Sequence, residues 1–124
     1  MEVVLSLGSN SGNRHRNVED ALEWLSGLLV DFRKSSLYKS PALGGSGQNY
    51  VNAVAIGNTE LTIEDLNRLA KERERKSGRD EHSKAIGKVP LDIDIVSADG
   101  IMMRPRDFAC DFFQRGWKEL NEQL

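Results

Sequence analysis

The chain has little of what a disulfide-stabilised, zinc-binding or membrane-spanning protein needs. Its only cysteine, Cys110, excludes an internal disulfide and fits a reducing compartment. Its two histidines, His15 and His82, do not have the spacing of zinc ligands. No apolar run approaches the roughly 20 residues that cross a membrane, and the N-terminus lacks the basic region and cleavage site of a signal peptide. We therefore expect a cytoplasmic protein.

An excess of one charge is also missing. Lysine and arginine number 17 against 19 acidic residues, whereas a general nucleic-acid-binding protein usually carries a basic excess. Among the predicted strands, Tyr50 is nearly the only aromatic residue that could stack on a base. An RNA-binding domain is thus the least favoured alternative. A chain of 124 residues builds one hydrophobic core, so we expect residues 1–124 to form a single domain.

Hydrophobic periodicity predicts alternating strands and helices. Runs of strand-forming residues between turn signals indicate strands at residues 3–7, 32–39 and 50–56, period-two alternation indicates one at 91–96, and a short edge strand is expected at 101–103. Helical spacing predicts helices over residues 18–29 and 63–75, the second opened by the N-cap Thr62 and ended by Gly78, and a terminal helix at 115–124. A polar, basic loop is expected at 79–90. The order strand, helix, strand, strand, helix, strand predicts an α+β, ferredoxin-like βαββαβ sandwich. Its antiparallel sheet would carry helices on one face and leave the other open for a ligand.

The most informative stretch is residues 91–96, in which apolar and acidic residues alternate strictly. This alternation is typical of a half-buried strand, so Asp92 and Asp94 should point together away from the core. Aspartate is a poor strand former, and like charges on one strand face repel each other. The two positions lie about 6.5–7 Å apart along a strand, which suits a divalent cation that carries a phosphate ester. The alternative is a solvated strand face.

Four pieces of the chain, in this order, share a further resemblance. They are Leu7-Gly8-Ser9-Asn10 with Gly12; residues 36–41 followed by 48–52; Glu74 with Gly78-Arg79; and Gly87 followed by residues 91–95. Each piece alone fits an ordinary turn, strand or helix end. Together, in this order and spacing, they resemble the 6-hydroxymethyl-7,8-dihydropterin pyrophosphokinase family of folate biosynthesis. This family has a ferredoxin-like fold, in agreement with the predicted element order.

The resemblance implies that the chain transfers the β,γ-pyrophosphoryl group of ATP to the hydroxymethyl group of the pterin and releases AMP. It implies ATP as co-substrate and two Mg²⁺ ions, held by Asp92 and Asp94, that bridge the ATP phosphates. The expected partners are these small molecules, without nucleic acid or membrane. The sequence leaves the oligomeric state open, with a monomer favoured.

The resemblance also implies roles for individual residues. Catalysis would involve Asp92, Asp94, Arg79 and Lys88. Pterin contacts would come from Ser40, Pro41, Leu43, Tyr50, Asn52 and Trp117, and ATP contacts from Glu74, Arg79, Lys84, Lys88, Ile95 and Arg115. The loop at 42–48 would close over the reacting groups. For single residues a structural alternative stands, in which Asn52 faces water, Tyr50 belongs to the core and Arg79 complements a helix C-terminus.

The chain departs from the family where phosphate is handled. Ile86 stands at an aromatic position, Val89 at an arginine position and Glu81 at a basic position, and Pro105 is followed by Arg106 instead of histidine. Valine cannot replace a guanidinium that binds phosphate oxygens in pairs. A diverged, non-catalytic relative that binds a pterin or nucleotide is therefore the alternative function.

Overall fold

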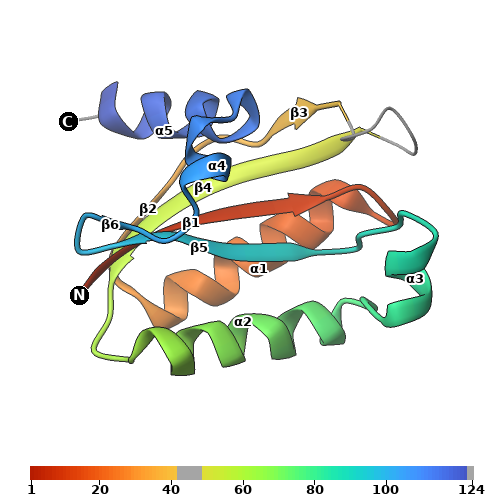
Figure 1. The fold of residues 1–124 in the computed structure, drawn as a ribbon, viewed down its shortest axis with the longest axis horizontal. Helices are drawn as coiled ribbons and strands as arrows, with labels where there is room; N and C mark the ends of the chain where they lie inside the picture. The colour runs from red at the N-terminus through yellow and green to blue at the C-terminus, as the bar shows by residue number, and fades with distance from the viewer. Residues whose placement is uncertain (42–48, 123–124) are drawn as a thin grey trace.

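The computed structural model describes residues 1–41 and 49–122 and shows a sheet between two unequal layers of helices (Figure 1). Its strands are β1 (Glu2–Ser9), β2 (Val30–Lys34), β3 (Tyr38–Ser40), β4 (Tyr50–Asn58), β5 (Asp92–Ala98) and β6 (Ile101–Met102). Its helices are α1 (Arg14–Leu28), α2 (Ile63–Lys76), α3 (Glu81–Ala85), α4 (Pro105–Ala109) and α5 (Asp111–Glu122).

Every strand pair in the described sheet is antiparallel, and the order across it is β2-β4-β1-β5-β6, with β3 pairing with β4. The central strand β1 lies between β4 and β5, so Leu5 pairs with Ala55 on one side and Ile95 on the other. This arrangement places the first strand of the βαββαβ unit directly beside the last one. It confirms the predicted α+β, ferredoxin-like fold.

Helices α1 and α2 cover one face of the sheet, as predicted (Figure 1). Apolar residues at alternate positions, such as Leu5, Ala53 and Ile93, pack with Leu22 and Leu66 of these helices in the main buried core. Because strand side chains alternate between faces, the intervening residues of β1, β4 and β5 must point to the opposite face. Side chains of three adjacent strands that do not belong to the main core therefore lie together on this opposite face, where they can line a binding site.

The opposite face is covered only in part, by α4 and α5 (Figure 1). Val54 and Val96 of the sheet pack with Phe113 and Leu120 of α5 in a second buried cluster. Farther along the strands, where β1 ends and β5 begins, polar residues replace the apolar ones. This end of the face stays accessible to a ligand.

Helix α2 has well-defined ends. The Thr62 hydroxyl accepts a hydrogen bond from the Asp65 amide (3.1 Å), which confirms the predicted N-cap. At the other end Gly78 adopts a φ of +98°, and the Arg79 amide donates to the Glu74 carbonyl (3.2 Å). This left-handed glycine termination confirms the predicted stop. It also sets the point at which Arg79 leaves the helix.

The predicted strand at 32–39 is wrong as one continuous element, because the chain leaves the sheet between β2 and β3. The Ser35 amide donates to the Val54 carbonyl (2.8 Å), and the Ser35 hydroxyl accepts from the Val54 amide (2.9 Å). A side-chain oxygen thus takes the place of a backbone acceptor, so the ladder is interrupted there. Pairing with β4 resumes at Tyr38.

The predicted loop at 79–90 contains the short helix α3. Asp80 and Ser83 exchange hydrogen bonds across its first turn: the Ser83 amide donates to Asp80 Oδ1 (2.7 Å) and the Asp80 amide to Ser83 Oγ (3.0 Å). This reciprocal capping indicates the start of a helix. The prediction of a loop considered only the polarity of these residues and so missed it.

In the tail, the predicted edge strand is confirmed as β6, whereas the terminal helix begins at Asp111 rather than residue 115. The earlier start carries Phe112 and Phe113 into the helix, and Phe113 becomes fully buried under the sheet. No helix in residues 1–41 and 49–122 is both long and apolar enough to cross a membrane.

Helix α5 approaches the sheet closely at Gly116, and a side chain there should destabilise the fold. A Cβ atom at Gly116 would lie 2.6 Å from Val54 Cγ2 and 2.8 Å from the Tyr38 hydroxyl. We expect Gly116→Ala to lower the free energy of unfolding by about 1–3 kcal/mol in urea denaturation. The control is Gly27→Ala in α1, where a Cβ meets nothing within 4 Å, and stability should be unchanged or higher by up to about 1 kcal/mol. Equal stability of the two variants would contradict the close approach.

Candidate functional site

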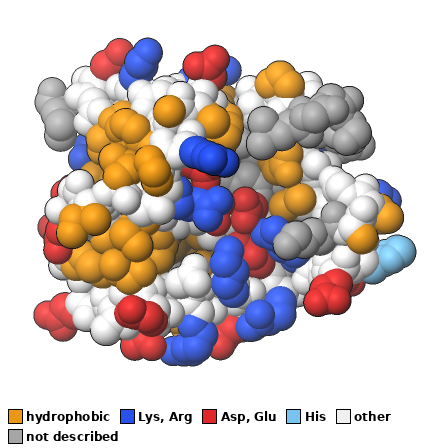
Figure 2. Space-filling view, viewed as in Figure 1, with side chains coloured by type: hydrophobic (Ala, Val, Ile, Leu, Met, Phe, Trp, Pro, Cys, Tyr) orange, Lys and Arg blue, Asp and Glu red, His pale blue; other side chains and the backbone are white. Residues whose placement is uncertain are grey.

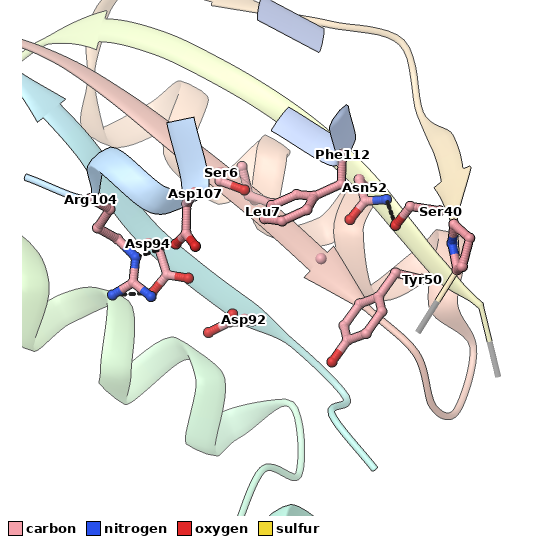
Figure 3. A pocket seen from close by; sticks show the side chains of 12 residues that line it. Ser6, Leu7, Ser40, Tyr50, Asn52, Asp92, Asp94, Arg104, Asp107 and Phe112 are labelled. Carbon is pink, nitrogen blue, oxygen red and sulfur yellow. Dashed lines mark hydrogen bonds and ion pairs between the residues drawn. The ribbon is translucent and has the colours of Figure 1, made fainter. Parts of the chain in front are cut away.

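A polar pocket lies on the partly covered face of the sheet, beside α4 and the start of α5 (Figures 2 and 3). Strands β1, β4 and β5 form its floor, and the C-terminal helices form one wall. Figure 2 shows acidic and basic side chains gathered in the middle of this face. The lining residues are Ser6, Leu7, Gly8, Ser40, Pro41, Tyr50, Asn52, Asp92, Asp94, Arg104, Asp107 and Phe112.

Asp92 and Asp94 lie side by side in the pocket, as the alternation along β5 predicts (Figure 3). Burial, together with the negative charge of Asp92, raises the pKa of Asp94 to about 7. Burial alone would also raise the pKa of Asp92, but hydrogen bonding to Asp94 and Arg79 holds it below its ordinary value. The protein alone therefore stabilises one negative charge well at this position and a second one poorly.

A network around Glu74 holds the start of β5 to the end of α2. The buried Glu74 carboxylate accepts hydrogen bonds from the Ile93 amide (2.9 Å), Lys71 Nζ (2.9 Å) and Arg79 Nη1 (3.0 Å). Arg79 Nη1 also donates to Asp92 Oδ1 (2.8 Å). The predicted catalytic arginine thus contacts Asp92, one member of the carboxylate pair. The predicted ATP contact Glu74 is occupied in positioning β5 and Arg79.

The other part of the pocket is built around the amide of Asn52 on β4. Asn52 is only 4% exposed, and its Nδ2 donates to Ser40 Oγ (2.7 Å), while its amide oxygen points away from Ser40 (Figure 3). Tyr50 lies on the same strand face, and burial together with the Asp92 charge raises its pKa. Gly8 of β1 keeps the floor clear, since a Cβ there would lie 3.3 Å from both Asn52 Oδ1 and Tyr50 Cδ1.

Besides Ser6, Leu7 and Gly8 of β1, three lining residues of the tail were given no site role from the sequence: Arg104, Asp107 and Phe112. Arg104 immediately precedes α4; its Nε pairs with Asp107, and its Nη1 lies 3.7 Å from Asp94 Oδ1. Phe112 of α5 places its ring in the pocket (Figure 3). These residues belong to no recognisable motif, and only the path of the tail back across the sheet brings them to β5. Pro105, at the first position of α4, was the one local sign of a helix start.

Besides Glu74, Arg79 and Ile95, three predicted site residues in the described part of the chain do not line the pocket. Trp117 is partly buried in the second cluster, its ring centroid 6.0 Å from that of Phe113. Arg115 lies over the Tyr38 ring, 5.1 Å from its centroid, and borders a hollow on the outer side of α5. Lys88 is exposed on the loop before β5. Trp117 lies away from the pocket because its apolar ring is buried more favourably in the second cluster.

The remaining predicted residues divide between a second hollow and undescribed positions. The second hollow adjoins the pocket on the α2 side and is lined by Ile63, Glu64, Asn67, Lys71, Asp94, Ile95, Met103 and Arg104. Ile95, a predicted ATP contact, is therefore at its surface. Leu43, the side chain of Lys84 and the predicted closing loop at 42–48 lie outside the described residues.

The loop before β5 is fastened to the turn between β1 and α1 by Asn10. Asn10 Nδ2 donates to the Gly87 carbonyl (3.0 Å), and Asn10 Oδ1 accepts from the Val89 amide (2.6 Å). The Asn10 amide donates in turn to the Val89 carbonyl (2.9 Å). The backbone at Val89 is thus held in place, although its side chain carries no charge for a phosphate.

The residues present fit a Mg²⁺ ion that arrives with a phosphate ligand. In the described part of the chain no three His, Cys, Asp or Glu side chains form a complete metal cluster. Mg²⁺ in phosphate-binding sites commonly takes one or two protein carboxylates and completes its coordination with phosphate oxygens and water. Asp92 and Asp94 match this donor set, and a cation would relieve the repulsion that raises the pKa of Asp94. The pocket can therefore receive a metal-bound phosphate chain near the aspartates and a polar ring near Asn52.

Without bound metal, the stability contributed by protonated Asp94 should be present below pH 4 and lost as the pH rises through about 7. The reason is that the folded protein binds this proton more tightly than the unfolded chain does. Asp94→Asn mimics the protonated form, so in EDTA we expect it to exceed the wild type in stability by about 1–3 kcal/mol at pH 8, with a smaller difference at pH 4.5. Thermal unfolding across this pH range measures the effect. Asp20→Asn, an exposed change on α1, controls for the substitution; a difference for Asp94→Asn that is independent of pH would refute the assignment.

The sequence of the chain matches a known protein family. The sequence model of the 7,8-dihydro-6-hydroxymethylpterin-pyrophosphokinase (HPPK) family matches residues 4–122. The chain is 37% identical over 95 residues to the 2-amino-4-hydroxy-6-hydroxymethyldihydropteridine pyrophosphokinase of Aquifex aeolicus, covering 76% of this chain and 59% of that protein. It is also 37% identical over 102 residues to the protein of the same name from Porphyromonas gingivalis, covering 76% and 67%.

Longer proteins match as well. The chain is 38% identical over 98 residues to a folate synthesis bifunctional protein of Arabidopsis thaliana, covering 77% of this chain and 20% of that protein. It thus spans about a fifth of the length of this relative. Since the family match extends over residues 4–122, the chain belongs to the 7,8-dihydro-6-hydroxymethylpterin-pyrophosphokinase family.

Proposed function

We propose that this protein transfers a diphosphoryl group from ATP to the hydroxymethyl group of 6-hydroxymethyl-7,8-dihydropterin. The hydroxymethyl oxygen bonds to the β-phosphorus, the bond from that phosphorus to the α–β bridging oxygen breaks, and AMP leaves while the hydroxyl loses its proton. One observation carries the proposal: a single pocket joins a buried amide to a pair of carboxylates, in a chain of this family.

The amide part of the pocket suits the ring of a pterin, which presents hydrogen-bond donors and acceptors along one edge. Because Ser40 Oγ accepts from Asn52 Nδ2, the Asn52 amide oxygen is oriented as an acceptor for a ring N–H. Tyr50 and Phe112 add aromatic surface around this position. The ring would be held by few polar contacts in fixed orientations, as small-molecule sites usually are.

The second hollow suits the nucleoside of ATP, with Ile95 at its surface. The phosphates would then run across Asp94, which borders both the hollow and the pocket. Arg79 lies beside this path, held by Glu74 and Asp92. Of the other predicted ATP contacts, Lys88 and Arg115 would have to act from outside the two cavities.

Asp92 and Asp94 would hold the Mg²⁺ that accompanies ATP, two ions by the family resemblance. When bound, Mg²⁺ neutralises and orients the phosphate oxygens. The protein's own residues supply positioning, with Asn52 and Asp94 at two parts of one pocket. Asp94 lines the pocket in which the acceptor hydroxyl would lie, and its carboxylate is our candidate acceptor for the hydroxyl proton.

The proposal treats residues 1–124 as one domain that works in the cytoplasm on small molecules, without nucleic acid or membrane, and as a monomer. The family match to residues 4–122 supports the single domain. One Arabidopsis relative is named as mitochondrial, so compartments differ among relatives.

A non-catalytic relative that binds the same ligands is the second candidate. It is favoured by Val89, a half-buried apolar residue at the family's arginine position. It is also favoured by the pairing of Arg79 with two carboxylates, which competes with phosphate for the guanidinium.

The test is ³¹P NMR of ATP with Mg²⁺, the purified protein and 6-hydroxymethyl-7,8-dihydropterin. Resonances of AMP and a pterin diphosphate should appear together. ATP that stays intact while its resonances broaden, only when both Mg²⁺ and protein are present, identifies the non-catalytic relative. An unchanged spectrum would reject both functions.

Loss of the Asn52 amide should weaken pterin binding selectively. We expect Asn52→Ala to raise the dissociation constant of the pterin by about 30-fold or more, because the ring N–H loses its acceptor in a buried site. Affinity for Mg·ATP should change little. Asn58→Ala, at the other end of the same strand, is the matched control and should bind both ligands normally. Calorimetric titration measures both affinities, and a parallel loss of the two would point to misfolding instead.

Removal of both aspartates should abolish binding of Mg·ATP without unfolding the protein. The double variant Asp92→Ala, Asp94→Ala loses the metal ligands, but it also removes two carboxylates that repel each other on one strand. We therefore expect a melting temperature in EDTA equal to or above that of the wild type. Normal Mg·ATP affinity of this variant in calorimetry would disprove the metal assignment.

A further inference from the structure

We propose that Arg104 is a further catalytic residue, which binds the diphosphoryl group while it moves from ATP to the acceptor. The inference rests on the proposed function and adds a residue that the resemblance does not include. It follows from where Arg104 lies, from the N–H donors that its guanidinium retains, and from the ion pairs that the other nearby cations already form.

Arg104 lies where the two cavities meet. Among the described residues, Asp94 and Arg104 alone line both the pocket and the second hollow. An acceptor hydroxyl in the pocket and a phosphate chain entering from the hollow must meet at this junction. Figure 3 shows the Arg104 guanidinium beside Asp94 on the same side of β5. The transferred group would therefore pass within reach of its N–H donors.

The guanidinium is held in place but retains donor capacity. Its Nε pairs with Asp107, which sets its direction. Its Nη1 lies 3.7 Å from Asp94 Oδ1, beyond the length of a direct hydrogen bond. The side chain is 47% exposed and lines the pocket, so a ligand there can reach it. A guanidinium offers paired N–H groups that match the oxygens of a phosphate.

The other described cations near the pocket are more strongly committed. Arg79 Nη1 donates to both Glu74 and Asp92, at 3.0 and 2.8 Å. Lys71 donates to Glu74 at 2.9 Å. Diphosphoryl transfer needs charge neutralisation where negative charge builds up, and an arginine at such a position can supply orders of magnitude in rate. Arg104 provides at this junction the type of group that Val89 does not.

A purely structural role is the competing explanation, since Arg104 is the residue before α4 and pairs with Asp107 in its first turn. The two explanations differ in what they predict for Asp107→Asn. This change removes the negative charge of the pair, but the asparagine amide oxygen can still accept from Arg104 Nε and keep the guanidinium at the junction. A structural role makes it as harmful as Arg104→Ala, whereas a catalytic role makes it much milder.

The experiment compares Arg104→Ala, Arg104→Lys and Asp107→Asn with the wild type, with Arg16→Ala as an exposed arginine control on α1. Steady-state kinetics give kcat and KM for the pterin. Calorimetry gives the affinity for α,β-methylene-ATP with Mg²⁺, an analogue whose α–β bridge cannot be cleaved. Thermal unfolding verifies that each variant is folded.

We expect Arg104→Ala to lower kcat by about 100-fold or more, with KM for the pterin nearly unchanged and a normal melting temperature. Arg104→Lys should recover part of the loss, since it restores charge but not the paired donors. Wild-type kcat and analogue affinity in folded Arg104→Ala would overturn the inference alone. If the wild type has no turnover, the transfer function fails, and a weaker analogue affinity of Arg104→Ala still supports phosphate binding by Arg104. A wild type that does not bind the analogue would overturn both proposals.

Discussion

The site depends above all on one buried carboxylate, that of Glu74. β5 has little pairing on its outer side before β6, so the Ile93 amide would otherwise lack a partner at the sheet edge. Glu74 accepts this amide and, with its second oxygen, orients Arg79 toward Asp92. A single side chain of α2 thus sets both the edge of the sheet and the direction of a cation. The negative charge of Glu74 is tolerable inside the protein only because Lys71 and Arg79 compensate it.

The second face of the sheet has one region that stabilises the fold and another that lines the pocket. Under α5, Val54 and Val96 bury apolar surface and hold the C-terminal helices in place. A few residues along the same strands, Asn52 and Asp94 replace apolar residues and line the pocket. The two-residue period of a strand thus determines which face of the sheet a side chain occupies. Its position along the strand determines whether it packs under α5 or lines the pocket. The helices that complete the second core also deliver Phe112 to the pocket, so packing and ligand binding share one element.

Sequence reasoning identified those parts of the site that depend on local pattern. The alternation around Asp92 and Asp94 predicted their common direction, because a strand has a fixed period and a buried face. The break at Ser35 could not be seen, since a hydroxyl that replaces a backbone acceptor leaves β propensity unchanged. Trp117, expected at the pterin, packs in the second cluster, and Arg104, for which the sequence predicted no role, lines the pocket; the reason is non-local. The path of the tail across the sheet decides which of its side chains meets the pocket and which one fills the second cluster.

The fastening of Asn10 to the loop before β5 bears on how the protein folds. The Asn10 side chain bonds to Gly87 and Val89, which lie 77 and 79 positions farther along the chain. Closing so long a loop is entropically unfavourable, and two hydrogen bonds do not offset it alone. The contact must therefore form after β1 and β5 have paired, which makes the loop beside the aspartates one of the last segments to become ordered.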